Sequence, residues 1–427
     1  MDVSSERQSS LFFLNKIGVI SLGFFLVTFL ITKGSQFFIP VVLANILPRE
    51  VYGSLEVAMS SALIILSVVS LGSTAFISRR LIQNESWISL SVIKFYLILV
   101  TIVLVGLSFL CEFLSVFPTL KLALIFCAVL LLQGTVSTEL KSIRRRNASL
   151  IIDVLLWLAL LVWAFLTYSI DLFQTSSYSF WFIALYFIAL FIKVGSAIKP
   201  PIIPNWRTGV RYIKEGLNIV VMGFSGAVVA SGGRLIVGFG IGDEAAGNFS
   251  ALYRIAIFPI VFHQLIMLYF YKDSFKRDHE RFKLLGASVF WIITIISVLF
   301  FFALHYSYSF FGEAFSSNFI DYPVAFLALM LTIPFWSATS INELAYYKEA
   351  DSSFPNLVSA TYILAVFLVT IYLISFDDLS FAASLVAIFV IGYFVINSLS
   401  LIRVGLPVAK SPIFAGMLVI VGLLVTL

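Results

Sequence analysis

The stretch Ser231–Pro259, SGGRLIVGFGIGDEAAGNFSALYRIAIFP, is the part of the chain that decides its fold. Two apolar segments flank a short acidic turn that begins at Gly242, and this pattern predicts a hairpin of two helices. Each helix carries one arginine, Arg234 before the turn and Arg254 after it. Counted from the turn, both arginines lie roughly 10 Å along the helix axis. A cation at that depth in an apolar helix is costly, so both are candidates for a functional site.

The composition of the whole chain agrees with the apolar character of this stretch. Of 427 residues, 61% are hydrophobic and only 11% are charged, whereas a soluble domain carries about 25% charged residues. We therefore expect a polytopic α-helical membrane protein without a cleavable signal peptide, because the apolar run after MDVSSERQSS is too long. Cys111 and Cys127 both fall in apolar runs and predict no disulfide framework. The net charge of +5 reflects membrane orientation rather than nucleic-acid binding.

Apolar runs of about 20 residues predict twelve membrane spans. In chain order these are Phe12–Leu47, Val51–Ser78, Ile88–Leu110, Leu120–Thr138, Leu150–Ile170, Phe180–Ile198, Ile213–Phe239, Ala245–Tyr271, Leu284–Tyr306, Phe319–Ala345, Phe354–Ile374 and Phe381–Leu401. The apolar tail Pro412–Leu427 is short for a span. It forms either an interfacial segment or a thin thirteenth span.

Basic residues gather in alternate loops. The basic set comprises Arg79, Arg80, Lys141, Arg144, Arg145, Arg146, Lys199, Arg207, Arg211, Lys214, Lys272, Lys276, Arg277, Arg281, Lys283, Lys348, Arg403 and Lys410. The other loops are short and hold only Arg49 and Lys121 as basic residues. The positive-inside rule places the basic loops and the N-terminus in the cytoplasm.

Two short matches indicate an internal repeat. The turn Leu47–Leu55 aligns without a gap with Ile241–Phe249, so that Gly53 matches Gly247. Thr138-Glu139-Leu140 likewise aligns with Asn342-Glu343-Leu344. We predict two six-helix lobes in the same orientation, related by a parallel pseudo-twofold around a central cavity. The lobes are residues 1–205 and 206–405, joined by the proline-rich linker Lys199–Trp206 and followed by a short apolar segment, 406–427.

Few charged residues fall inside the predicted spans. They are Lys33, Glu56, Lys94, Asp153, Lys193, Arg234, Arg254 and Glu343. Lys94 and Lys193 are expected to extend toward the inner interface. Asp153 and Glu343 lie near inner span ends, where they pair with basic loops or couple transport to an ion. Glu56, close under the outer turn, pairs either with Arg49 at the surface or with a deep cation.

Lys33, Arg234 and Arg254 are the deepest cations, and two interpretations remain for them. They form structural salt bridges, or they line a cationic cavity between the lobes. Such a cavity suits phosphate, because a guanidinium presents a planar fork to phosphate oxygens and an ammonium a point charge. A lumen of this kind would bind a lipid pyrophosphate headgroup or acidic sugars.

Enzyme motifs are missing from the sequence. It contains no GxxxxGK[ST] phosphate loop, so no built-in ATPase is predicted. The three histidines, His263, His279 and His305, do not have the spacing of metal ligands. We expect no enzymatic activity, no cofactor and no metal.

Two segments resemble a known family. Lys33–Ser78, with its Leu-Pro-Arg-Glu-Val-Tyr-Gly turn, and Arg234–Ile255, with Arg-Leu-Ile-Val-Gly and Gly-Asn-Phe-Ser-Ala-Leu-Tyr-Arg-Ile, resemble the polysaccharide flippases. These are the Wzx-type O-antigen transporters of the multidrug/oligosaccharidyl-lipid/polysaccharide exporter superfamily. Chain length, helix count, two lobes and short outer loops fit that family along nearly the whole chain.

The resemblance implies a function and partners. It implies a V-shaped bundle in the bacterial inner membrane that moves an undecaprenyl-diphosphate-linked oligosaccharide to the periplasmic leaflet by alternating access. It also implies an ion or proton gradient as the energy source, and other polysaccharide-assembly membrane proteins are candidate partners. The chain departs from the family at Gly233, where an acidic residue often precedes the arginine that matches Arg234. Either Arg234 is freer to meet substrate, or another acid such as Glu56 replaces the missing one.

Two alternatives stand beside this hypothesis. A cation-coupled multidrug antiporter of the same superfamily would need a more acidic cavity than these residues supply. A membrane glycosyltransferase such as an O-antigen polymerase typically carries a large periplasmic loop, and the outer loops here are short.

Overall fold

A computed structural model gives the fold of the chain and describes residues 19–82, 89–115, 118–143, 145–169, 181–198, 206–266, 279–349, 354–373 and 378–426. Within these ranges every regular element is a helix. Nine of the described helices are long and apolar enough to cross a membrane, and a bent helix pair makes a tenth candidate. Three shorter apolar helices lie at the predicted sixth and eleventh spans and at the C-terminal tail. The protein is thus an all-helical multi-pass membrane protein, as its composition predicts.

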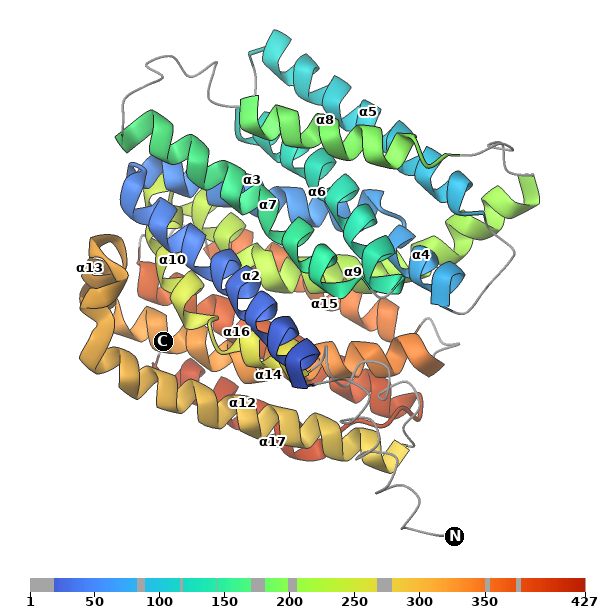
Figure 1. The fold of residues 1–427 in the computed structure, drawn as a ribbon. Helices are drawn as coiled ribbons and strands as arrows, with labels where there is room; N and C mark the ends of the chain where they lie inside the picture. The colour runs from blue at the N-terminus through green and yellow to red at the C-terminus, as the bar shows by residue number, and fades with distance from the viewer. Residues whose placement is uncertain are drawn as a thin grey trace.

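The first lobe contains the helices from α2 to α8, coloured blue to green in Figure 1. They are α2 (Val19–Ile46), α3 (Arg49–Val69), α4 (Ser73–Ile82), α5 (Leu90–Phe113), α6 (Pro118–Ser142), α7 (Arg146–Ala164), which ends in the π-turn η1 (Phe165–Ser169), and α8 (Trp181–Gly195). Helix α6 packs against α3, α5 and α7, and it forms the centre of this lobe.

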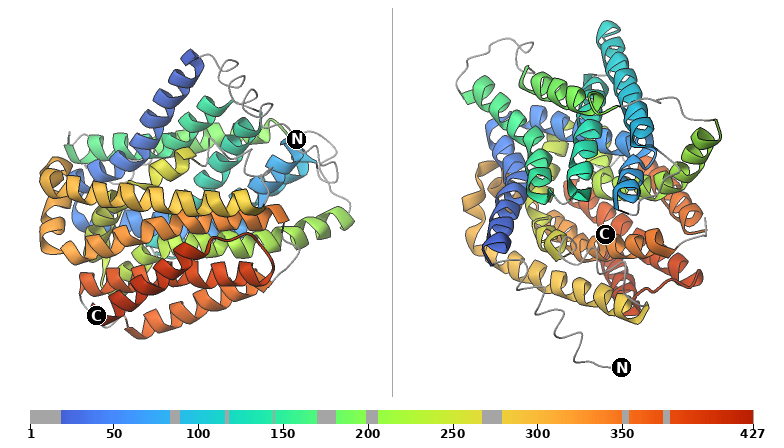
Figure 2. Two further views of the ribbon diagram at one scale, coloured as in Figure 1. Left: turned by 90° about the horizontal axis from the view of Figure 1, so that it is seen from below. Right: turned by 45° about the vertical axis from the view of Figure 1, so that its right-hand side comes forward.

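The second lobe contains the helices from α9 onward. They are α9 (Trp206–Gly240), α10 (Asp243–Ala256), α12 (His279–Ser307), η2 (Tyr308–Phe311), α13 (Glu313–Asp321), α14 (Pro323–Glu349), α15 (Phe354–Leu373) and α16 (Leu379–Arg403). The C-terminal tail forms α17 (Lys410–Thr426), which packs on α16, α12 and α14. Figure 2 shows α17 along the outside of the second lobe.

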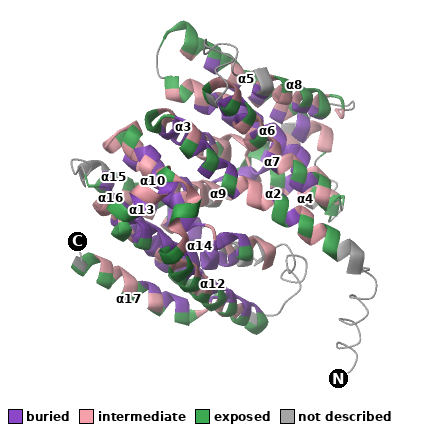
Figure 3. Ribbon diagram, turned by 60° about the vertical axis from the view of Figure 1, so that its left-hand side comes forward, coloured by how far each residue is buried: buried purple, intermediate pink, exposed green. Residues whose placement is uncertain are grey.

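Two large clusters of buried side chains form most of the hydrophobic core, one mainly in each lobe, and the cluster centred on the second lobe also includes Phe37 and Val57 of the first. Leu43, Phe76 and Phe126 belong to the core of the first lobe, and Phe282, Phe326 and Tyr393 to that of the second. Large apolar side chains on the outer faces of α5 and α12 are exposed, as Figure 3 shows in green. A soluble protein would bury such faces, whereas a membrane protein presents them to lipid.

The two lobes meet where α3 crosses α10, and the crossing is made by the two glycines of the sequence repeat. A Cβ added to Gly53 would lie 1.7 Å from the Asp243 carbonyl oxygen, and one added to Gly247 would lie 2.5 Å from that of Arg49. Only glycine permits this approach of two backbones. The contacts are reciprocal, as a pseudo-twofold between same-oriented halves requires. We call the end of the bundle that holds the α2–α3 and α9–α10 turns the hairpin end.

Three of the predicted spans are interrupted. The second ends at Val69, because Leu71 and Gly72 have φ of 44° and 67° and stop the helix before α4. The eighth bends by 48° between Asp243–Ala256 and Ile260–Ile266, where Pro259 can donate no backbone hydrogen bond. The tenth is broken at Tyr322, so its first residues belong to α13 and its long helix, α14, starts at Pro323. The predicted linker 199–205 lies outside the described residues, and the lobe boundary stays a prediction.

Candidate functional site

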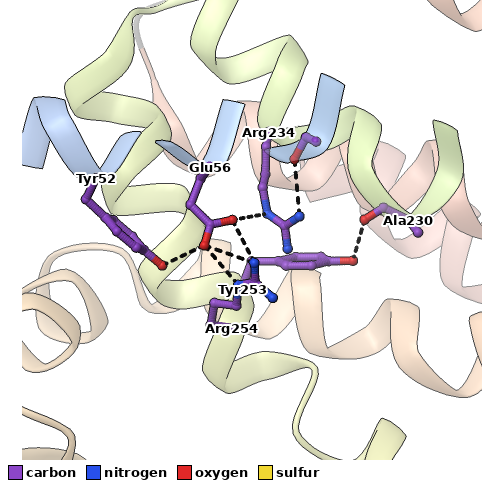
Figure 4. Close-up of polar contacts among 7 residues, drawn as sticks. Tyr52, Glu56, Ala230, Arg234, Tyr253 and Arg254 are labelled. Carbon is purple, nitrogen blue, oxygen red and sulfur yellow. Dashed lines mark hydrogen bonds and ion pairs between the residues drawn. The ribbon is translucent and has the colours of Figure 1, made fainter. Parts of the chain in front are cut away.

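A buried ion cluster joins the lobes close to the glycine crossing (Figure 4). Glu56 from α3 accepts hydrogen bonds from Arg254 of α10, from Nε to Oε1 at 3.1 Å and from Nη2 to Oε2 at 2.9 Å. Arg234 of α9 approaches the same carboxylate, with Nε 3.4 Å from Oε2. The Tyr52 hydroxyl donates to Oε1 at 3.0 Å. We call Glu56, Arg234 and Arg254 the triad.

Aromatic and hydroxyl groups complete the surroundings of the two guanidinium groups. The Cζ of Arg234 lies 4.6 Å from the centroid of the Tyr253 ring, and its Nη1 donates to the Ser60 hydroxyl at 3.3 Å. The Cζ of Arg254 lies 4.9 Å from the Trp157 ring on α7 of the first lobe. The Tyr253 hydroxyl donates to the Ala230 carbonyl at 3.0 Å, which fixes that ring. Cation–π contacts thus support both arginines.

The side chains of the triad are buried and carry an excess of positive charge. The exposed fractions of the side chains are 1% for Glu56, 5% for Arg234 and 11% for Arg254. One carboxylate faces two guanidinium groups, so the cluster carries a formal net charge of +1. Arg254 is the better neutralised of the two, because Nε of Arg234 makes no hydrogen bond. A second anion would therefore be stabilised here.

The direction in which helical side chains lean explains how the two arginines meet. Arg234 lies about 9 Å from the C-terminal end of α9, whereas Arg254 lies about 16 Å along α10, deeper than the sequence count gave. Side chains lean toward the N-terminus of their own helix. The Arg234 side chain therefore leans away from the hairpin end and that of Arg254 leans toward it, so their heads converge on Glu56.

Packing explains why a glycine, and no acidic residue, precedes Arg234. A Cβ at this position would lie 2.9 Å from Val386 Cγ1 on α16 and 3.0 Å from Phe249 Cζ on α10. An aspartate therefore does not fit beside Arg234. The acid comes from the opposite lobe, as Glu56, which is the second of the two outcomes expected from the sequence.

The other intramembrane charges lie elsewhere. Lys33 on α2 donates to Gln36 Oε1 at 2.9 Å, and Asp153 on α7 pairs with Lys141 on α6 at 3.0 Å. Lys94 does not extend to the interface: it is buried and pairs with Glu139 at 2.8 Å, because α6 brings that carboxylate beside it. Lys193 is exposed, and its extension to the inner interface stays a prediction. Glu343 is on α14, but its side chain lies outside the described residues.

Sequence reasoning missed the neutral members of the site. Tyr52, Ser60, Trp157 and Tyr253 carry no charge, and in an apolar run nothing distinguishes them from packing residues. Helical spacing offers one signal, because Tyr52 and Ser60 each lie four positions from Glu56 and so share its face. Among the described residues no cluster of three His, Cys, Asp or Glu side chains could hold a metal.

A small apolar pocket opens beside Arg254. Its other lining residues are Phe37 and Phe38 from α2, Ile255 and Phe258 from α10 and the bend that follows it, Phe300 from α12 and Phe311 from η2. The pocket lies between helices of both lobes. Arg254 is the one member of the triad that lines this pocket.

Comparisons with known proteins give a fold but no sequence relative. No family model and no curated protein matches the chain. A solved structure of a multidrug resistance MATE family transporter of the MOP superfamily, in an inward-facing conformation, aligns with 92% of this chain and 95% of its own length. Its TM-score is 0.55 at 15% sequence identity. This chain therefore has the fold of a MATE family transporter of the MOP superfamily.

Proposed function

We propose that this protein is a flippase that moves an undecaprenyl-diphosphate-linked oligosaccharide, an O-antigen-type repeat unit, across the bacterial inner membrane. The observation that carries the proposal is the triad: two buried guanidinium groups of one lobe share a single carboxylate of the other. The fold is that of a transporter family, and this charge balance selects the kind of cargo. A buried site with an excess cation favours an anion.

The chemistry of the arginines fits a diphosphate. A guanidinium donates two parallel hydrogen bonds to two oxygens of one phosphate, and such charge-assisted bonds are short and strong. Arg254 already binds the Glu56 carboxylate through both Nε and Nη2. A phosphate offers similar geometry with more charge, so it would compete with Glu56 for the same donors.

This competition links cargo binding to the movement of the lobes. Glu56 belongs to the first lobe and both arginines to the second, so the triad holds the lobes together at the hairpin end. An anion that takes the place of Glu56 on the arginines removes this link. A ligand shifts a conformational equilibrium by its difference in affinity for the two states, and alternating access follows from such a shift.

The charges argue against the antiporter, and the loop lengths argue against the glycosyltransferase. A multidrug antiporter for cationic drugs needs an unpaired acid, whereas Glu56 is neutralised by two arginines. A glycosyltransferase with an outer catalytic loop does not fit the short outer loops in the sequence. Inner-membrane location with a cytoplasmic N-terminus, and coupling to protons or sodium ions, belong to the same proposal.

Deletion of the gene tests the proposal. We expect the deletion strain to lose surface polysaccharide and to accumulate lipid-linked repeat units on the cytoplasmic side of the membrane, and a plasmid copy to restore both. Increased sensitivity to cationic drugs with normal polysaccharide would favour the antiporter. Accumulation of single repeat units that reach the periplasm but are not polymerised would favour the polymerase.

A further inference from the structure

A second group of polar side chains lies inside the first lobe. Lys33 donates to Gln36, whose Nε2 donates to the backbone oxygen of Asp153 at 2.8 Å. Gln133 Nε2 donates to the same backbone oxygen at 3.0 Å. The Tyr186 hydroxyl donates to Gln133 Oε1 at 3.1 Å. The side chains come from α2, α6 and α8, and α7 supplies the backbone oxygen.

The group is continuous with the triad through one tryptophan. Trp157 lies one helical turn after Asp153 on α7, and its ring lies against the Arg254 guanidinium. At the other end, Lys141 near the C-terminus of α6 pairs with the Asp153 carboxylate. Polar groups therefore follow one another from the end of the bundle opposite the hairpin end to the arginines. We call Lys33, Gln36, Gln133, Asp153, Trp157 and Tyr186 the polar strip.

The chemistry of the polar strip differs from that of the triad. Its two planar amides, carboxylate, phenol and indole supply hydrogen-bond donors and acceptors, and both Lys33 and Lys141 have a partner within it. Polar groups inside membrane helices are costly, and they commonly mark a substrate path. A sugar ring presents hydroxyl groups at its edge and apolar C–H groups on its faces. Amides and carboxylates suit the edge, and an indole ring suits the face.

We infer that the polar strip of the first lobe binds the glycan of the cargo, with Trp157 as the ring on which a sugar stacks. This inference rests on the proposed function. In it, the first lobe binds the glycan and the arginines of the second lobe bind the diphosphate. In this conformation Arg254 covers the Trp157 ring. A phosphate that draws Arg254 away uncovers the ring, so the two parts of the cargo bind in a fixed order.

Binding measurements on the purified full-length protein in nanodiscs test the inference. The two probes are undecaprenyl diphosphate and the same lipid carrying one N-acetylhexosamine. Trp157→Ala should lower the affinity for the glycosylated probe about tenfold more than the affinity for the bare lipid, because it removes the stacking face as well as the support of Arg254. Trp157→Phe, which keeps an aromatic face, should retain most of the preference for the glycosylated probe. Trp291→Ala, which removes an exposed indole on the outer face of α12, is the matched control and should change neither affinity.

Each other outcome decides a different question. If the wild type binds both probes equally, the polar strip does not recognise sugar, and the proposed function stands. If Trp157→Ala lowers both affinities by the same factor, the ring only supports Arg254, and the inference is wrong. If the wild type binds neither probe, the proposed function fails and the inference fails with it. A thermal unfolding curve for each variant separates loss of binding from loss of fold.

Discussion

The unequal charges of the triad predict an order of stability among three single variants. Glu56→Gln leaves two buried guanidinium groups facing each other without a counter-ion. Arg254→Gln leaves the Glu56 carboxylate with Arg234 alone, at 3.4 Å and without a hydrogen bond to Nε. Arg234→Gln leaves the bidentate Glu56–Arg254 pair intact, and the formal charge of that pair is zero. Each change removes one charge, and both arginine variants leave one carboxylate with one guanidinium. Only Arg234→Gln keeps the pair that is joined by two hydrogen bonds.

The magnitudes follow from this balance. Removing one partner of a buried ion pair costs about 3–5 kcal/mol, because the other charge stays buried and uncompensated. Glu56→Gln should reach this range, and Arg254→Gln should fall toward its lower end. Arg234→Gln loses one long hydrogen bond to Ser60 and the contact with the Tyr253 ring, but it also removes the excess charge. Its net cost should stay within about 1 kcal/mol.

Thermal unfolding of the purified variants, followed by size-exclusion chromatography, measures the order. Unfolding of a protein of this size is treated as a rate, so midpoints are compared at one heating rate. Lys94→Met is the control, because it removes a buried lysine from an ion pair within the first lobe whose other member, Glu139, is partly exposed. If Arg234→Gln is destabilised as much as Glu56→Gln, the three charges are not arranged as an unbalanced triad, and the argument for an anionic cargo loses its basis.

Three further predictions concern export, the lobe contact and topology. Arg234→Ala should abolish polysaccharide export while the protein stays abundant. Arg234→Lys should restore export only partly, because an ammonium lacks the planar fork of a guanidinium. Normal export by Arg234→Ala would show that this arginine does not belong to the cargo site. Gly53→Val should impair export and thermal stability more than Gly23→Val, since Gly23 has open space around its Cβ position and Gly53 does not; equal effects would contradict the close lobe contact. In a background without native cysteines, Ser115→Cys should react with an impermeant thiol reagent from the periplasm and Ser411→Cys should not; the reverse pattern would invert the proposed orientation.

Much of the fold follows from the sequence because membrane spans depend on local composition. Each of the twelve predicted spans contains a described helix, and the equivalence of Gly53 and Gly247 follows from the repeat. The interruption at Leu71–Gly72 was missed, because it depends on contact with another helix: a Cβ on Gly72 would lie 2.9 Å from Ile219 on α9. Lys94 was misplaced for the same reason, since its partner Glu139 comes from α6.

The candidate site was only partly predictable. Depth alone identified the two arginines, and the search for a counter-ion identified Glu56. Lys33 was grouped with them because it lies at similar depth, but its bond to Gln36 ties it to the polar strip. Which helix face a residue occupies decides its partners, and that depends on how the helices pack. Trp157 could not be selected from the sequence, because an aromatic residue in an apolar run is usually a packing residue.

The internal repeat explains why the charges of the triad meet at the lobe contact. The register that aligns Gly53 with Gly247 also aligns Glu56 with Ser250 and Ser60 with Arg254. The two halves thus offer the same pair of positions near the crossing, one filled by an acid and a serine, the other by a serine and a base. A pseudo-twofold makes the contacts between the halves reciprocal, so the contact of Glu56 with Arg254 has Ser250 and Ser60 as its counterpart pair of positions. Ser250, the counterpart of Glu56, is buried and makes no hydrogen bond, and the second half therefore supplies no acid of its own at this position. Had both halves kept the acid and the base, the site would hold balanced pairs. With Ser250 in place of an acid and Arg234 added, the site has two guanidinium groups and one carboxylate. A phosphate-bearing cargo would supply the missing negative charge.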